Sequence, residues 1–143
     1  MLLPYAEDIG HYWKTSTSSP DVWMDKTKKV IQDIGGLVEA EGYGSSGERA
    51  AYMMAFSLSG QHYKVVWPVL PTLRGKDIDA RRQAATLLYH DIKAKAMTAS
   101  VLGERVAFFS YLALPDGRIA GEVAAPELGQ VFPLSLTPRA EAK

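Results

Sequence analysis

Hydrophobic residues recur along the middle of the chain in two helical and two strand-like patterns. A helical pattern from Ser19 to Glu41 precedes alternating apolar residues from Ala50 to Val69. A second helical pattern from Asp77 to Leu102 precedes a second alternating pattern from Arg105 to Val123. Spacings of three to four residues are typical of helices, and strict alternation is typical of strands. The order predicts an α+β fold of the type αββ–αββ, with two helices packed on an antiparallel sheet of four or more strands.

Both predicted helices carry signals at their ends. Ser19-Pro20 suits a helix start, because Ser caps the helix and Pro lacks only a donor that the first turn does not use. Either Asp77 or Asp79 is expected to cap the second helix, and Gly103 is expected to end it. Gly35-Gly36 lies inside the first pattern, where the two glycines either allow close packing or end the regular helix early.

The predicted hairpins are marked by their turns. Ser59-Gly60 can join the strands of the first hairpin. Pro115-Asp116-Gly117 has the residue types of a tight turn with positive φ at Gly117. Gly42 to Gly47 is expected to be a flexible connection; its glycines match the dinucleotide fingerprint, but they follow a helix instead of a strand. Residues 131–136 are one candidate for a further strand docked on the core.

Composition divides the chain into three parts. Residues 1–18 form an N-terminal arm with large aromatic rings, residues 19–124 a single α+β core domain, and residues 125–143 a C-terminal tail containing prolines. The 143 residues, 47% of them hydrophobic, suit one domain with its own core. Arm and tail carry more apolar side chains than free termini need, so we expect docking on the core or on a second subunit. A homo-oligomer is therefore expected.

Composition also excludes several classes of protein. The chain has no cysteine, which excludes disulfides, thiolate metal sites and thiol enzymes and favours a reducing compartment. No apolar stretch approaches the about 18–20 residues of a membrane span, and Met1 to Asp8 lacks the features of a signal peptide. Neighbours His90 and Asp91 point about 100° apart on a helix, so they cannot share one metal ion. The sequence favours a cytoplasmic, non-enzymatic protein without a metal or cofactor.

Charge is balanced over the whole chain but not along it. Between Gly60 and Arg105 there are eight basic and four acidic residues, against five and eight from Met1 to Ser59. Basic groups beside aromatic rings suit single-stranded nucleic acid, because cations contact phosphates and bases stack on rings. The alternative is a solvated helix face beside core aromatics. The candidate contacts in this segment are Lys64, Trp67, Arg74, Arg81, Arg82 and Lys93.

A second candidate site lies on the apolar stripe of the second helix. Lys95 falls inside that stripe and Arg81 lies close to it. Asp91 precedes Lys95 by four residues, a spacing that favours an ion pair on a helix. Either the stem of Lys95 covers the edge of the core while its charge reaches water, or Arg81, Asp91 and Lys95 face a ligand cleft or subunit interface.

Several short motifs resemble a loose group of small, uncharacterised proteins of bacteriophages and mobile elements. They are Lys26-Thr27, the strand around Phe56, the helix at Arg81-Arg82-Gln83-Ala84, and the segment from Phe109 to Arg118. The resemblance extends from Trp23 to Glu122 and consists of hydrophobic and turn patterns. The group has no established activity, so the resemblance implies only a setting: a phage or mobile-element accessory protein in the cytoplasm of a host cell.

Three hypotheses for function remain open. The first is a non-enzymatic accessory protein that binds nucleic acid, with single strands favoured, through the basic strand and helix surface. The second is an interaction protein that inhibits or sequesters a host factor or a nucleotide signal. The third is a small enzyme built around His90, Asp91 and Lys95. Steep loss of affinity with salt would favour the first, and a nucleotide cleft would place Arg81 and Lys95 in one concavity.

Overall fold

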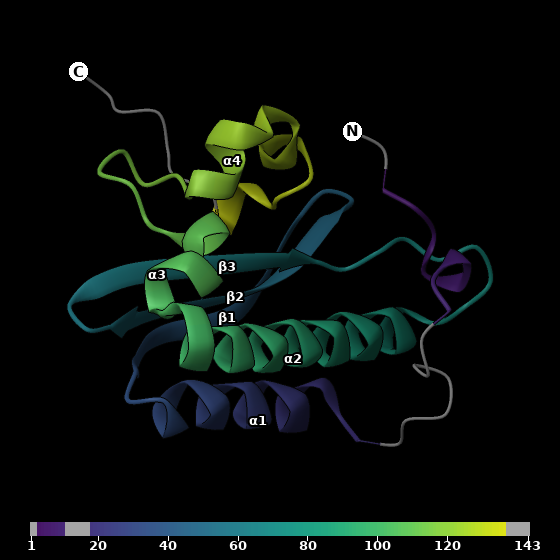
Figure 1. The fold of residues 1–143 in the computed structure, drawn as a ribbon. Helices are drawn as coiled ribbons and strands as arrows, with labels where there is room; N and C mark the ends of the chain where they lie inside the picture. The colour runs from purple at the N-terminus through teal and green to yellow at the C-terminus, as the bar shows by residue number, and fades with distance from the viewer. Residues whose placement is uncertain (1–2, 11–17, 137–143) are drawn as a thin grey trace.

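A three-stranded antiparallel sheet with two long helices along one face forms the core of the protein (Figure 1). The computed structural model describes residues 3–10 and 18–136. The core elements in chain order are α1 (Pro20–Asp33), β1 (Leu37–Ser46), β2 (Arg49–Leu58), β3 (Gln61–Pro68) and α2 (Asp77–Leu102). The strands pair in the order β1-β2-β3. The core is therefore αβββα: the α+β class is confirmed, and the finer αββ–αββ prediction is wrong.

Short helical segments flank this core. They are η1 (Ala6–Asp8), α3 (Glu104–Ala107), η3 (Phe109–Tyr111), α4 (Ala120–Ala124), η4 (Pro126–Gln130) and η5 (Leu134–Leu136). The described part of the N-terminal arm contains η1, whereas two of the arm's aromatic residues, Tyr12 and Trp13, lie outside the described residues. No helix in the described ranges is long and apolar enough to cross a membrane.

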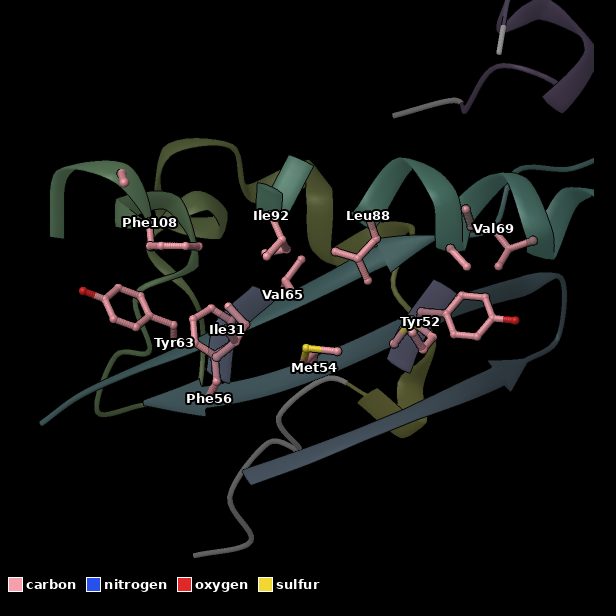
Figure 2. Packing of buried hydrophobic residues seen from close by; sticks show 14 of the residues in the cluster. Ile31, Tyr52, Met54, Phe56, Tyr63, Val65, Val69, Leu88, Ile92 and Phe108 are labelled. Carbon is pink, nitrogen blue, oxygen red and sulfur yellow. The ribbon is translucent and has the colours of Figure 1, made fainter. Parts of the chain in front are cut away.

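The two faces of the sheet bury different side chains. The face toward α1 and α2 carries the main core, which Figure 2 shows from close by; its buried strand residues include Tyr52, Met54, Phe56, Leu58, Tyr63 and Val65. On the opposite face Ala51 and Val66 pack with Val131 and Phe132. The predicted first hairpin is confirmed, with positive φ at both turn residues, Ser59 and Gly60.

The first correction concerns β1. The sequence predicted that its residues would form the end of the first helix and a flexible connection, but they form a strand. Helix α1 ends at Asp33, and Gly35 has φ +89°, which an α-helix does not continue through. A Cβ on Gly36 would lie 2.6 Å from Cγ2 of Ile31. Both expected roles of this glycine pair are therefore observed: one ends the helical region and the other allows close packing. The following residues pair with β2 from Leu37 to Ser46 as an edge strand.

The second correction concerns the predicted second hairpin. Residues 104–111 form α3 and η3 instead, with the N–H of Phe108 donating to the carbonyl of Glu104 at 2.9 Å. Among the described residues one bridge of the expected ladder remains, between Ala113 and Ile119, and Leu112 forms a separate bridge with Tyr63 of β3. The sheet therefore has three strands among the described residues, not four or more. The candidate strand at 131–136 likewise docks on the core but ends in η5.

Helix α2 is confirmed from its first to its last residue, and Gly103, with φ +93°, ends it as expected. The expected cap is wrong, because the N-cap is Lys76 and no side chain makes the capping hydrogen bond. Asp77 and Asp79 instead lie in the first helical turn, where carboxylates favour the positive end of the helix dipole.

The predicted turn before Arg118 is present although its hairpin is not. Gly117 has φ +89° and donates to the carbonyl of Leu114 at 2.9 Å. We expect Gly117→Val to lower the free energy of unfolding by about 1 kcal/mol or more, because a β-branched residue is strained at positive φ. Thermal unfolding measures the loss, and Gly117→Asn is the control that tolerates this conformation better. An unchanged melting temperature in the Val variant would contradict a turn with positive φ at residue 117.

Candidate nucleic-acid interface

The six candidate contacts lie in different parts of the fold. Lys64 is on the sheet face away from the helices, paired across the strands with Ala55. Its Nζ donates to the carbonyl oxygen of Leu136 at 2.8 Å, and burial lowers the pKa of this ammonium group. Trp67 lies on the helix-facing side with Tyr63 and is partly buried against the core. The two residues therefore face opposite sides of β3.

Arg74 is exposed in the loop between β3 and α2, where the N-terminal arm holds the backbone. The Glu7 carboxylate accepts hydrogen bonds from the N–H groups of residues 73–75 at 2.8 to 3.2 Å. These bonds, that of Arg74 first, lower the pKa of Glu7 to about 2. The arm is also tied to this loop by the N–H of Ala6, which donates to the carbonyl of Pro71 at 2.8 Å. The described part of the arm thus docks on its own chain.

Two further candidates, Arg81 and Arg82, are held by contacts within the chain. The guanidinium carbon of Arg81 lies 4.3 Å from the centre of the Tyr43 ring, and its Nε donates to the Tyr52 hydroxyl at 3.1 Å. Arg82 donates to the Ser18 carbonyl at 2.9 Å and pairs with Asp79 at 2.9 Å. Both arginines are partly buried by these contacts, and Arg82 joins the start of α1 to α2.

Lys93 differs from the other five because it belongs to a partly exposed aromatic cluster. Trp23 of α1 meets Tyr89 and His90 of α2, which runs alongside α1 (Figure 1). The ring centres are 5.3 Å apart for Trp23 and Tyr89, 5.4 Å for Tyr89 and His90, and 6.3 Å for Trp23 and His90. We call these three rings, together with Lys26 and Lys93, the α1–α2 aromatic surface.

Two lysines flank the rings of the α1–α2 aromatic surface. Lys26 Nζ lies 4.3 Å from the centre of the Trp23 ring, and Lys93 Nζ lies 5.7 Å from the centre of the Tyr89 ring. Both lysines are exposed, and neither pairs with a carboxylate among the described residues. The ammonium groups are thus placed beside aromatic rings with no anion from the described residues to neutralise them, which leaves them available to phosphate.

Helical spacing explains how the sequence builds this surface. Lysines follow their rings by three residues in α1 (Trp23, Lys26) and by four in α2 (Tyr89, Lys93), which places each pair on one face. Of this set, the candidate contacts predicted from the sequence included only Lys93, because they were taken from the basic segment between Gly60 and Arg105. The aromatic–lysine spacings were the signal that could have revealed the rest. Trp23 is in fact half-buried, and its Nε1 is a buried donor with no partner among the residues that the structure describes.

The ion pair predicted on α2 is confirmed. Lys95 Nζ lies 2.8 Å from Oδ1 of Asp91, and the hydroxyl of Tyr111 donates to Oδ2 of the same carboxylate. Lys95 Nζ also lies 5.1 Å from the centre of the Tyr111 ring. Burial first, and then the adjacent carboxylate, raises the pKa of Tyr111, so the hydroxyl keeps the proton that it donates. These contacts among Asp91, Lys95 and Tyr111 attach η3 to α2.

The structure does not bring Arg81 to this cluster. Arg81 and Lys95 are separated by fourteen positions on one helix, a rise of about 21 Å, so they do not share a concavity. The described residues also contain no group of three histidines or carboxylates that could hold a metal ion.

The αβββα core and the α1–α2 aromatic surface define a small α+β protein with a candidate binding face on its helices. Comparison of the chain with family models, curated proteins and solved structures finds no match. The resemblance to phage proteins therefore remains an expectation from the sequence, and function has to be inferred from the geometry.

Proposed function

We propose that this protein is a non-enzymatic accessory protein of a phage or mobile element that binds single-stranded nucleic acid through the α1–α2 aromatic surface. The observation that carries the proposal is the cluster of three partly exposed rings, flanked by two lysines that pair with no carboxylate of the described chain. Of the residues suggested by the sequence, Lys93 belongs to this surface, and Arg82 occupies the same side of α2 toward α1. Lys64 and Trp67 are assigned structural roles instead.

Single strands are favoured over duplexes by the rings. Unpaired bases expose their faces and can stack on aromatic side chains, an interaction worth about 1–3 kcal/mol per base. Bases in a duplex are already stacked on each other. Lys26 lies on α1 beside Trp23 and Lys93 lies on α2 beside Tyr89, so each ammonium group is near a ring on which a base of the strand would stack. The proposed recognition is accordingly insensitive to sequence, since every base has a face to stack.

The test is a charge reversal at the two lysines. We expect Lys26→Glu with Lys93→Glu to weaken binding to a labelled single strand and to reduce the salt slope by about 1.4, at about 0.7 for each phosphate that is no longer neutralised. Folding should be unaffected, because both side chains are exposed and form no ion pair with the described residues. Fluorescence anisotropy between about 50 and 200 mM salt measures the slope.

A matched control separates a local contact from the effect of net charge. Arg49→Glu with Arg105→Glu makes the same change in charge at exposed positions, one at the start of β2 and one in α3. This variant should bind the single strand like the wild type. Equal weakening in the two double variants would contradict a defined site on the helices.

A second candidate function is protein interaction, favoured by an apolar patch at the end of α2 and in the segments that follow it. Its side chains are between 57% and 81% exposed: Met97, Val101, Leu102, Val106 and Phe109. Large exposed apolar patches mark interaction surfaces. We propose that this patch joins copies of the chain in the homo-oligomer expected from the sequence.

Charged substitutions in the patch test that assembly. Val101→Asp with Val106→Asp should convert an oligomer into a monomer without unfolding it, because both side chains are largely exposed. Size-exclusion chromatography with light scattering measures the mass. A wild-type protein that is monomeric at high micromolar concentration would rule out self-association through this patch.

A further inference from the structure

An apolar cavity of about 400 Å³ lies between α2, the end of β3, the N-terminal arm and the segments after α3. Its wall includes the side chains of Trp67, Leu87, Tyr111, Ile119 and Phe132, and none of the residues that line it is charged. Pockets for small molecules are typically of this size and are lined mainly by apolar and aromatic side chains. The cavity is separate from the α1–α2 aromatic surface, with which it shares no residue.

One polar side chain in the cavity wall has an unused acceptor. Gln83 is fully buried, and its Nε2 donates to the carbonyl oxygen of Ala6 at 2.9 Å. That bond fixes which end of the amide is nitrogen, so the other end is the oxygen Oε1. This oxygen is buried without a hydrogen-bond partner among the described residues. A buried amide oxygen without a donor loses its hydration without compensation, and a ligand that supplies a donor would recover that loss.

We propose that this cavity binds a small, planar aromatic molecule that carries a single N–H or O–H donor, with Gln83 Oε1 as the acceptor. Three aromatic side chains in the wall, Trp67, Tyr111 and Phe132, favour a planar aromatic ligand. Gln83 Oε1, a buried acceptor without a partner among the described residues, favours a ligand that carries a donor. Because Oε1 is not exposed to solvent, the ligand reaches it only when the amide turns slightly about its soft last torsion, which also lengthens the Nε2 bond to Ala6.

The chemistry of the wall argues against a nucleotide in this cavity. A phosphate carries negative charge that cationic side chains usually neutralise, whereas the wall has no basic side chain. Arg81 and Lys95, which the nucleotide hypothesis required in one concavity, are both absent from the wall. The ligand is therefore neutral or nearly so.

The probes are indole, which has one N–H donor, and 1-methylindole, which has the same ring system without it. We expect indole to bind the full chain about tenfold more tightly than 1-methylindole. Calorimetric titration measures both affinities. In a ¹⁵N-labelled protein, indole should also shift the side-chain amide resonance of Gln83, a readout that needs no substitution.

Two variants locate the binding. Leu87→Trp fills the cavity from α2 and should abolish binding of both probes while the protein remains folded. Gln83→Met keeps the length of the side chain without its oxygen and should remove the preference for indole. Absence of indole binding to the wild type, equal affinity for the two probes, or unchanged binding in Leu87→Trp would each overturn the proposal. Because the nucleic-acid surface shares none of these residues, its own test is unaffected by the result.

Discussion

Replacing Phe108 with Ala should lower the free energy of unfolding by about 3–5 kcal/mol, the usual cost of deleting a buried aromatic ring. Phe108 is fully buried, and its ring lies 5.5 Å from that of Phe56 and 5.8 Å from that of Tyr63. These two strand residues also stack on each other at 5.7 Å. A loss of this size is a large fraction of the about 5–15 kcal/mol that stabilises a typical domain.

The chain offers a control one residue away. Phe109 is 57% exposed, so Phe109→Ala should change stability by no more than about 0.5 kcal/mol, as is usual on the surface. Denaturant unfolding at a concentration where the protein is monomeric measures both variants. Similar losses at the two positions would show that the α3–η3 segment does not pack as described.

The second large effect is expected at Asp91, which joins two partners. Asp91→Ala leaves the hydroxyl of Tyr111 and the ammonium of Lys95 without their shared acceptor. We expect stability to fall by about 2–3 kcal/mol, because a buried donor without a partner bears its full desolvation cost. The side chains of Asp91 and Lys95 are each 24% exposed, so the effect should be smaller than for a fully buried ion pair.

A combined variant separates the effect of unsatisfied donors from that of weaker packing. Asp91→Ala with Tyr111→Phe and Lys95→Met removes the acceptor and both donors, so it should be more stable than Asp91→Ala alone. Chemical denaturation compares both variants with the wild type. A combined variant as unstable as the single one would mean that packing, not unsatisfied donors, causes the destabilisation. If the free energy of unfolding of Asp91→Ala equals that of the wild type, a structural role for the cluster is contradicted.

Elements with a strong periodic pattern were predictable from the sequence. Helix α2 has its apolar residues at helical spacing over 26 positions, and a glycine ends it. The β2–β3 hairpin alternates because one side of each strand packs against the helices. In both cases a single buried face repeats along the element, so the hydrophobic pattern reports the structure directly.

The missed elements lack such a face. Strand β1 is an edge strand that is mostly exposed, and two of its positions are glycines. A Cβ at one of them, Gly44, would lie 2.7 Å from the Ser135 hydroxyl oxygen, so the glycine allows the C-terminal segment to approach. In the predicted second hairpin, buried Ala107 and Phe108 are followed by exposed Phe109 and Ser110. Two buried residues followed by two exposed ones is the burial pattern of a helical turn. In a short run of apolar residues, the sequence does not distinguish this pattern from the alternation of a strand.

The candidate site was harder to predict than the fold, because basic residues that are close in sequence do not necessarily lie on the same surface of the folded protein. Arg81 and Arg82 are neighbours in sequence, yet one contacts Tyr43 of β1 and the other the Ser18 carbonyl before α1. Lys26 lies outside the basic segment but meets the same ring cluster as Lys93, because α1 packs beside α2. Only the tertiary arrangement brings these two lysines together.

The most direct test of the proposed function is the affinity of the wild-type protein for a labelled single strand of about 16 nucleotides and for a duplex of equal length. Anisotropy titrations between about 50 and 200 mM salt would measure both affinities. The proposal predicts tighter binding to the single strand, with affinity that falls linearly in the logarithm of salt concentration. No binding at the lowest salt, or no preference over the duplex, would contradict it and leave protein interaction as the function to pursue.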